Sequence, residues 1–320
     1  MTIRILDRIT GAVIAALALA LIAVLAGVID AGPLDPPGAP GETDGVREPG
    51  TPIQTIPFAI TTPGYYYLTH NLTDSGGSFG IRIDVSDVTL DLKGFTLRGG
   101  GGSLDGVRVV TAASNITIRN GVIRNWGGSG ILFSSPATSN GSNMHDLHVS
   151  NNGGYGIWAG DRSIIHDVTV RGNSLGGIVA SFDALIQRCA VSNNGGDGIN
   201  AGARSVVRDN TVWLSSGDGV EISTGSLVEG NVLTENGLHV ADGAGVHATG
   251  TSNRIVDNLV RINDRGIAAD AAGSLIIGNH AVSNNVSNYA GIVAGNFMGP
   301  VLTAATMAAA GANPHANFAP

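Results

Sequence analysis

The sequence predicts an all-β fold, a parallel β-helix of about ten coils preceded by an apolar N-terminal helix. The main observation is a repeat. Residues 184–194 (ALIQRCAVSNN), followed by GGDGINAG, are matched 21 residues later by residues 205–216 (SVVRDNTVWLSS), followed by GDGVEIS. A fixed period of this length is typical of solenoids, so the repeat decides the fold class before any local pattern is considered.

A glycine followed by Ile or Val marks each repeat. These glycines, spaced 21 to 26 residues apart, are Gly80, Gly106, Gly130, Gly156, Gly177, Gly198, Gly219, Gly245, Gly266 and Gly291. Between the marks lie short alternating runs, such as 199–201 and 210–212, bounded by Gly, Asn, Asp and Ser, which is the pattern of short strands. Strands this short cannot bury an apolar face alone, so we expect each unit to stack on its neighbours as one coil.

An asparagine recurs at one position of successive units. Asn210, Asn231, Asn258 and Asn279 are spaced 21, 27 and 21 residues apart. Stacked amides at a corner can hydrogen-bond each other and the turn backbone, so this column predicts an asparagine ladder. Cys189 stands in the same column one coil earlier, which predicts a small buried residue rather than a reactive thiol.

Composition agrees with a long narrow core and argues against one class of partner. Charged residues make up 13% of the chain, aromatic residues 5% and hydrophobic residues 43%, and the net charge is -8 with a single lysine, Lys93. Binding to a nucleic-acid backbone needs clustered Lys and Arg, so we expect no nucleic acid as partner.

The N-terminal region predicts export. Arg4 and Arg8 precede 19 uncharged, mostly apolar residues, 11–29, and Asp30 follows. Such a segment is either a signal peptide or an uncleaved transmembrane anchor, and in both cases the body lies outside the cytoplasm, extracellular or periplasmic. The predicted division is 1–30 signal peptide or anchor, 31–52 disordered Pro/Gly-rich linker, 53–300 parallel β-helix and 301–320 C-terminal cap or tail. Residues 56–72 miss the repeat register and are predicted to cap the first coil.

Three stretches resemble a known family. Residues 57–73 (PFAITTPGYYYLTHNLT), 80–99 (GIRIDVSDVTLDLKGFTLRG) and 113–131 (ASNITIRNGVIRNWGGSGI) are similar to right-handed parallel β-helix repeat proteins of the pectate-lyase-like superfamily. The resemblance covers about residues 53–294 and implies the fold. It implies less about activity, because the superfamily includes lyases, hydrolases, epimerases, phage tailspikes and proteins of no known activity. The Asn-Thr-Asp, Asp-Asp, Gly-His-Gly and Arg-Ile-Lys motifs of polygalacturonase-like hydrolases do not occur.

The residue after each Gly-Ile pair is predicted to face outward, and this column, together with the residues just before each Gly, holds the candidate site. Asp197 and Asp218 lie one coil apart, about 5 Å, where two carboxylates either share a proton or hold a cation such as calcium. Glu221 and His247 lie beside them. We take these four as candidate catalytic residues, and Tyr155, Trp158, Asn200, His239 and Asp242 as candidate ligand-binding residues, with no metal ligands assigned. The alternative is that Asp-Gly is ordinary turn chemistry.

A second column, His145 and His166, is predicted to form an exposed polar ladder, since no third metal ligand is evident. The resulting hypothesis is an exported module that binds polysaccharide on its outer face without turnover. Two alternatives stay open. One is a polysaccharide lyase or glycoside hydrolase that uses the four candidate catalytic residues, and the other is a structural adhesin or trimeric spike. The membrane is a partner only if the N-terminal segment is uncleaved, and the sequence leaves the oligomeric state open.

Overall fold

The computed structural model describes residues 50–110, 112–134, 139–238, 243–303, 306, 313 and 315–319. These residues belong to one compact unit, Gly50–Pro320. The predicted N-terminal helix and most of the predicted linker therefore lie outside the described residues. Within the described ranges, no helix is long and apolar enough to cross a bilayer.

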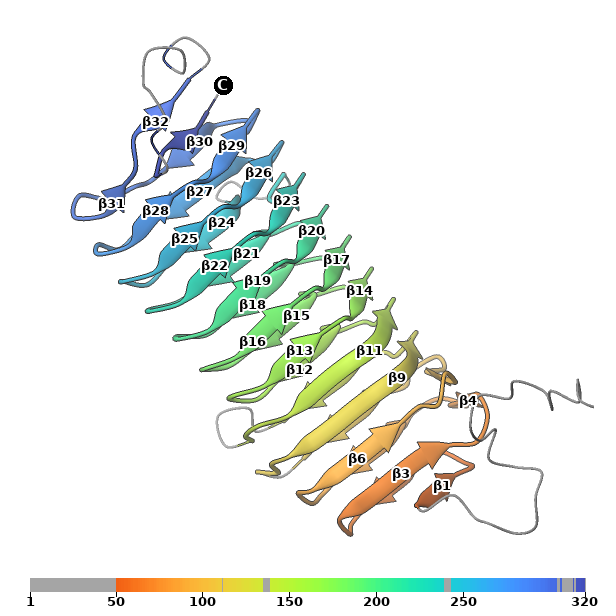
Figure 1. Ribbon diagram of the computed structural model, residues 1–320. Coiled ribbons are helices and arrows are strands. Elements are labelled where there is room, and N and C mark those ends of the chain that lie inside the picture. Colours follow the sequence, from red (N-terminus) through yellow and green to blue (C-terminus); the bar gives the residue numbers. More distant parts are fainter. Residues whose placement is uncertain are drawn as a thin grey trace, which may run out of the picture. The chain divides into compact units, whose positions relative to one another are not determined.

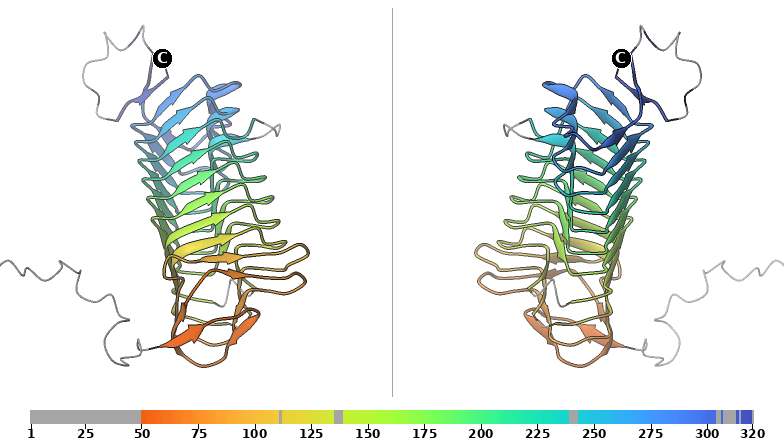
Figure 2. Two further views of the ribbon diagram at one scale, coloured as in Figure 1. Left: turned by 90° about the vertical axis from the view of Figure 1, so that its right-hand side faces the viewer. Right: turned by 90° about the vertical axis from the view of Figure 1, so that its left-hand side faces the viewer.

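The chain winds through successive coils whose strands pair in parallel with the coils before and after (Figures 1 and 2). One face, sheet 1, has 11 strands, one from each coil. Its strands are β2 (Phe58–Ile60), β5 (Ile81–Ile83), β8 (Val107–Val109), β10 (Ile131–Phe133), β12 (Ile157–Ala159), β15 (Ile178–Ala180), β18 (Ile199–Ala201), β21 (Val220–Ile222), β24 (Ala244–Ala248), β27 (Arg265–Ala269) and β30 (Ser287–Ala290). The coil number is close to the predicted one.

Two further faces, sheets 2 and 3, are joined because β9 (Ile116–Arg124) and β11 (Asn143–Ser150) run through both. Sheet 2 also contains β1 (Thr51–Ile53), β3 (Gly64–Leu68), β6 (Val88–Asp91), β13 (Ile164–His166), β16 (Leu185–Gln187), β19 (Val206–Arg208), β22 (Leu227–Glu229), β25 (Arg254–Val256), β28 (Leu275–Ile277) and β31 (Phe297–Met298). Sheet 3 also contains β4 (Leu72–Thr73), β7 (Thr96–Arg98), β14 (Thr169–Arg171), β17 (Ala190–Ser192), β20 (Thr211–Trp213), β23 (Val232–Thr234), β26 (Leu259–Arg261), β29 (His280–Val282) and β33 (Asn317–Phe318), which also pairs with β32 (Val301–Leu302).

The first coil differs from the prediction. Residues 56–72 form no separate cap: β2 pairs in register with β5, and β3 pairs with β6. Ala59 stands opposite Arg82, at the position that follows the glycine mark in later coils. The segment misses the repeat signal because Pro57 and Phe58 stand where later coils have Gly and then Ile or Val, although it occupies the same place in the coil.

The corner between sheets 2 and 3 explains the asparagine column. One residue per coil adopts a left-handed conformation there, for example Asp167 at φ 55° and Arg188 at φ 53°. The next residue turns inward. The predicted ladder is confirmed: the backbone N–H and side-chain Nδ2 of Asn210 both donate to Asn231 Oδ1, at 2.9 and 3.0 Å. Cys189 is buried in the same column, and its N–H donates to Asn210 Oδ1.

A second buried asparagine ladder lies at the corner between sheets 3 and 1, and the sequence analysis missed it. Its main rungs are Asn152, Asn173, Asn194, Asn236, Asn263 and Asn284, with Ser215 between the third and the fourth. Each asparagine of this ladder accepts from a backbone N–H of the coil before, as Asn173 Oδ1 does from Asn152 at 3.1 Å, whereas Ser215 Oγ has no hydrogen-bond partner among the described residues. These amides satisfy turn N–H groups that would otherwise be buried without partners.

The interior is filled by inward columns of Ile, Val, Leu and Ala, and most of these side chains are fully buried. At the C-terminal end, Asn317 extends the first ladder by one rung, since Asn279 N–H donates to Asn317 Oδ1 at 3.0 Å. Stacking each coil on the next buries one strand face and leaves the other outward. Each outward column therefore forms a straight row of side chains about 5 Å apart, and these rows carry the candidate sites.

Candidate functional site

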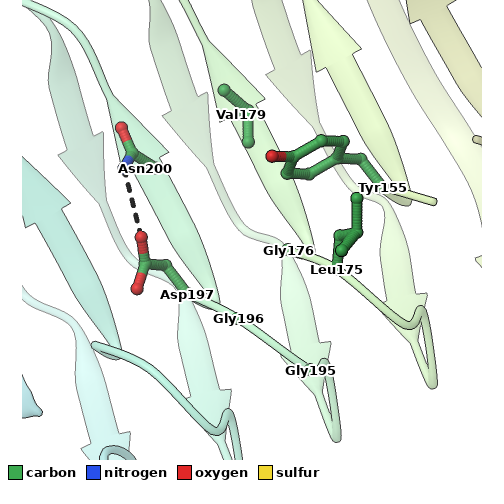
Figure 3. A pocket seen from close by; sticks show the side chains of 8 residues that line it. All are labelled: Tyr155, Leu175, Gly176, Val179, Gly195, Gly196, Asp197 and Asn200. Carbon is green, nitrogen blue, oxygen red and sulfur yellow. Dashed lines mark hydrogen bonds between the residues drawn. The ribbon is translucent and has the colours of Figure 1, made fainter.

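The outward column of sheet 1 forms the floor of an open groove. Two hollows lie along it, of about 280 and 340 Å³, and they share Gly195, Gly196 and Asp197. The first hollow also contains Tyr155 and Asn200 (Figure 3), and the second is lined by Gly195, Gly196, Asp197, Gly217, Asp218, Glu221, Gly243 and His247. One continuous groove therefore runs from Tyr155 to His247.

The structure brings together all four candidate catalytic residues. Asp197 and Asp218 come from the turns just before β18 and β21, whereas Glu221 and His247 are outward residues in β21 and β24. Glu221 and His247 stand directly opposite each other in neighbouring strands. The strand register alone creates this cluster, because equal positions of successive coils become neighbours.

Asp197 and Asp218 are not arranged as a pair that shares a proton. The backbone N–H of Asp218 donates to Asp197 Oδ1 at 3.0 Å, and Asn200 Nδ2 donates to Asp197 Oδ2 at 3.1 Å. Asp218 is held in the same way, since the N–H of Ala244 donates to its Oδ1. One oxygen of each carboxyl thus accepts a backbone N–H from the turn of the next coil, as the turn interpretation expects. The other oxygen bonds a side chain in the groove, Asn200 for Asp197 and His247 for Asp218.

His247 is the partner of the second Asp218 oxygen. Its Nδ1 lies 2.8 Å from Asp218 Oδ2, and its Nε2 lies 2.9 Å from Asp270 Oδ2. The hydrogen bond that His247 donates to Asp218 is the main reason that the pKa of His247 is raised to about 9, with Asp270 adding to it and burial opposing it. His247 is therefore an imidazolium at neutral pH and is not poised to act as a general base.

The two remaining carboxyls have environments that favour the neutral form. Burial raises the pKa of Asp197, and the nearby charge of Asp218 raises it further. Burial also raises the pKa of Glu221, and Asp197 and Asp218 add to this effect. Perturbed carboxyls in a groove are typical of sites that move protons or bind ligands. The cluster therefore holds two carboxyls that hold protons more readily than usual beside a charged imidazole.

Calcium fits this cluster poorly at neutral pH. Asp218, Glu221 and His247 offer ligand atoms that lie within 4.8 Å of one another. Calcium, however, prefers six to eight oxygen ligands. Here the third group is a nitrogen that carries a proton, and both oxygens of Asp218 already have partners. The cation held here is the His247 imidazolium, which is bonded to Asp218 and Asp270.

Tyr155 and Trp158, two of the candidate ligand-binding residues, do not form one flat platform. The rings of Tyr155 and Trp158 are 4.9 Å apart at an angle of 71°. Trp158 belongs to a separate hollow of about 240 Å³ with Arg108, Leu132 and Phe133. Only Tyr155 faces the groove, where its hydroxyl end points past Val179 towards Asn200 (Figure 3).

The other predicted residues divide into two groups. Asn200 lies in the groove as predicted, whereas His239 and Asp242 lie outside the described residues. His145 and His166 stack as neighbouring rungs, with ring centroids 5.0 Å apart and planes 2° apart, and each bonds the aspartate that follows it. These two histidines lie in sheet 2, away from the groove.

Asp270 is a site residue that the sequence analysis missed. It follows β27 and reaches back to His247 in the coil before. Its signal in the sequence is weak, because it stands four residues after the Gly266 mark, whereas the outward column lies two residues after each mark. A comparison of all coil positions with those of His247 would have placed it one coil away.

The fold and the groove define a parallel β-helix with one acidic, partly hollow outer face. The family model for the right-handed β-helix region matches residues 137–297, just over half of the chain, and the protein belongs to that family. This confirms the right-handed, pectate-lyase-like fold that the resemblance implied. A comparison with curated proteins gave no match.

Three solved structures are similar to this chain at low sequence identity. The A-module of mannuronan C-5 epimerase AlgE6 from Azotobacter vinelandii has a TM-score of 0.51 and 12% identity, over 79% of this chain and 81% of that chain. DFA-IIIase from Arthrobacter chlorophenolicus has a TM-score of 0.49 and 17% identity, over 67% of this chain and 60% of that chain. An alginate lyase from a Paenibacillus species has a TM-score of 0.46 and 13% identity, over 74% of this chain and 93% of that chain. At these identities the likeness concerns the fold.

Proposed function

We propose that this protein binds a polysaccharide chain in the groove over sheet 1. The observation that carries the proposal is the continuity of the two hollows through Gly195, Gly196 and Asp197. The groove crosses five coils, from β12 to β24, and so extends for about 20 Å along the stack. An open groove of this length suits an extended polymer better than a small molecule, which a closed pocket would bury.

The groups along the groove match the chemistry of a sugar chain. Tyr155 offers an aromatic face with a polar end, which suits the apolar face of a sugar ring. Asn200 and Asp197 offer an amide and a carboxyl for hydroxyl groups. Gly195 and Gly196, which line both hollows, have no side chain and let a sugar chain lie close to the backbone. The epimerase module that shares this fold is, as its name states, an enzyme of mannuronan, and polysaccharide is the ligand class proposed here.

The charge of the groove restricts the chain. Within the described residues, Asp218 and Asp270 outnumber the one cation of the cluster, His247, and Asp197 and Glu221 add negative charge whenever they are ionised. A polymer with a carboxylate on every sugar would be repelled where it passes these side chains. The ligand proposed for this part of the groove is therefore a neutral polysaccharide or one that carries amino groups.

Catalysis is a second candidate, and one observation favours it. Asp197 and Glu221 are half-buried carboxyls with raised pKa values beside a charged imidazole. A carboxyl with a raised pKa keeps its proton to a higher pH than usual and can then act as a general acid towards a glycosidic oxygen. On this account Glu221 would donate the proton, and the Asp218–His247–Asp270 chain would fix the local charge.

The experiment scores binding and turnover together. The protein is incubated with a panel of neutral, amino-bearing and acidic polysaccharides, and both retention and new chain ends are measured. Retention without new ends supports the binding proposal. New ends that disappear in a Glu221→Gln variant support catalysis. Absence of both on every polymer would contradict the proposed function.

Export is proposed on the sequence alone. Arg4 and Arg8 before residues 11–29 support a signal peptide or an anchor. A polysaccharide ligand agrees with an extracellular or periplasmic location. Fractionation of cells that produce the full chain, followed by N-terminal sequencing, distinguishes a cleaved product from an anchored one.

A further inference from the structure

The outer face of sheet 3 has a charge pattern that sets it apart. Two outward columns run along it, one from Thr96 to His280 and one from Thr73 to Val282. Neither column contains an acidic side chain, although the chain has 25 acidic residues and 17 Lys and Arg. The strands of this face form the right-hand edge of the stack in Figure 1, from β14 to β29.

Arginines gather at the N-terminal end of this face. Arg98, Arg124, Ser150 and Arg171 are successive members of one column. The three arginines are exposed, and the small Ser150 is buried between two of them. Arg98 and Arg124 are thus one coil apart, about 5 Å, and Arg124 and Arg171 are two coils apart, about 10 Å. We call this set the arginine column.

The arginine column lacks counter-charges among the described residues. Elsewhere in the protein, Arg119, Arg188 and Arg204 each pair with an aspartate, at 3.1, 2.8 and 2.7 Å. No such ion pair forms for Arg98, Arg124 or Arg171 within the part of the chain that the structure describes. Like charges in neighbouring coils destabilise a sheet slightly. Their presence in one row therefore points to an external anion.

A histidine beside the arginine column is affected by the positive charge of its arginines. His148 stands in the neighbouring outward column of β11. Burial lowers its pKa, and the charges of Arg171 and Arg124 lower it further. The side chain is therefore a neutral imidazole at physiological pH, able to donate one hydrogen bond to an anion.

An aromatic side chain continues the row. Trp213 lies two coils beyond Arg171, in the same column, and is only partly buried. Ser192 separates the two and leaves room above the strand. A row of guanidinium groups followed by an indole ring can pair with charged groups and then stack on a ring of the same polymer.

We propose that the arginine column binds an anionic polysaccharide, a chain that bears carboxylate or sulfate groups and runs along the coil stack from Arg98 towards Trp213. This surface is separate from the groove over sheet 1, and the proposal does not rest on the function proposed there. The acidic groove repels such a chain, whereas the arginine column attracts it. The two faces thus differ in the charge of the polymer that they accept.

Other polyanions fit the face less well. Nucleic acid carries a denser charge and is normally bound by larger clusters of Lys and Arg, in proteins of basic rather than acidic balance. The net charge here is -8. An anionic lipid surface would likewise attract a polybasic segment rather than three arginines in one row. An anionic sugar chain of moderate charge density matches a single row of three.

The test uses the full chain with polygalacturonate and dextran sulfate as anionic probes and dextran as the neutral probe. A triple variant, Arg98→Gln with Arg124→Gln and Arg171→Gln, removes the column. A matched control, Arg119→Gln with Arg188→Gln and Arg204→Gln, removes the same charge from arginines that are already paired. Affinities are measured from low to moderate salt, together with the NMR titration of His148.

We expect the column variant to bind at least one anionic probe roughly tenfold more weakly than the wild type, with a smaller dependence of affinity on salt. The control variant should retain most of its affinity, and the bound anion should raise the pKa of His148. Equal losses in the two variants would overturn the proposal, as would absence of binding to both anionic probes. Tighter binding to an oligo-dT strand or to phosphatidylglycerol vesicles would also overturn it.

Discussion

The imidazole Nδ1 of His247 lies 2.8 Å from the Oδ2 atom of Asp218, in the coil before it. On its other side Nε2 lies 2.9 Å from Asp270, in the coil after it. The histidine thus ties three successive coils together at the most acidic part of the groove. The side chains of His247 and Asp218 are only 11% and 8% exposed, so their contact is shielded from water, whereas Asp270 is 48% exposed.

The first prediction is that this contact makes stability depend on pH. The pKa of His247 rises from 6.5 to about 9 in the folded protein. Because the folded pKa is the higher one, the stabilisation is complete below pH 6.5 and is lost as the pH rises through about 9. We expect the free energy of unfolding to fall by about 1 to 3 kcal/mol across this window.

Urea unfolding at pH 6 and pH 9.5 measures this change. A His247→Gln variant should be less stable at pH 6 and should lack most of the pH-dependent loss. His280, an exposed histidine in sheet 3, gives the control variant His280→Gln. If the wild type and His247→Gln lost equal stability between the two pH values, the charged imidazole would not be a stabilising element.

The second prediction concerns calcium. A metal ion bound by Asp218, Glu221 and His247 would need a nitrogen of His247, and both of its nitrogens are already bonded to Asp218 and Asp270. Millimolar calcium should therefore leave the unfolding temperature unchanged at pH 7, because the imidazolium repels a second cation. A shift of several degrees at pH 7 that is lost in a Glu221→Gln variant would show instead that the cluster is a calcium site.

The third prediction uses the gap in the first asparagine ladder. Cys189 Sγ lies 3.7 Å from the Ile165 carbonyl and 3.2 Å from the Gln187 carbonyl. Two coils further along the same ladder, Asn231 Nδ2 donates to the equivalent carbonyls, those of Val207 and Glu229, at 2.9 and 3.1 Å. A Cys189→Asn variant should replace weak sulfur contacts by amide hydrogen bonds and raise the free energy of unfolding by about 1 kcal/mol.

The reciprocal change provides the control. Asn231→Cys should lower the free energy of unfolding by about 1 to 3 kcal/mol, because the buried N–H of Asn210 loses its acceptor. Urea titrations of the two variants beside the wild type give both values. Destabilisation by Cys189→Asn would mean that the column lacks the room for an amide at that coil.

The repeat was predictable because equal spacing in the sequence becomes equal position in space. Asn210 and Asn231, 21 residues apart, are bonded neighbours for that reason. The same equal spacing predicted that Asp197, Asp218, Glu221 and His247 lie close together. The outward direction of the column next to each glycine also held, since alternation along a short strand leaves no other choice.

Other features depend on contacts that spacing does not encode. The charge of His247 follows from Asp270, whose side chain reaches across a coil from the end of a strand. The angle of 71° between Tyr155 and Trp158 depends on rotamers, so the sequence could not show that only one ring faces the groove. The first coil was misassigned because Pro57 and Phe58 stand where other coils place Gly and then Ile or Val.

The groove itself can be tested by filling it. Gly196 lies in the wall shared by both hollows, and a Cβ atom added there meets its nearest neighbours at 3.5 Å, an ordinary contact. A Gly196→Phe variant should therefore fold and place its ring in the groove. Gly101, in an exposed turn with nothing within 4 Å of an added Cβ, provides the control Gly101→Phe.

The most direct measurement is retention of these two variants and the wild type on the neutral or amino-bearing polysaccharide that the panel identifies. The account predicts that Gly196→Phe loses at least about tenfold in affinity, since the chain cannot pass a filled groove, and that Gly101→Phe binds as the wild type does. Equal retention of all three proteins would contradict the assignment of the groove as the binding site.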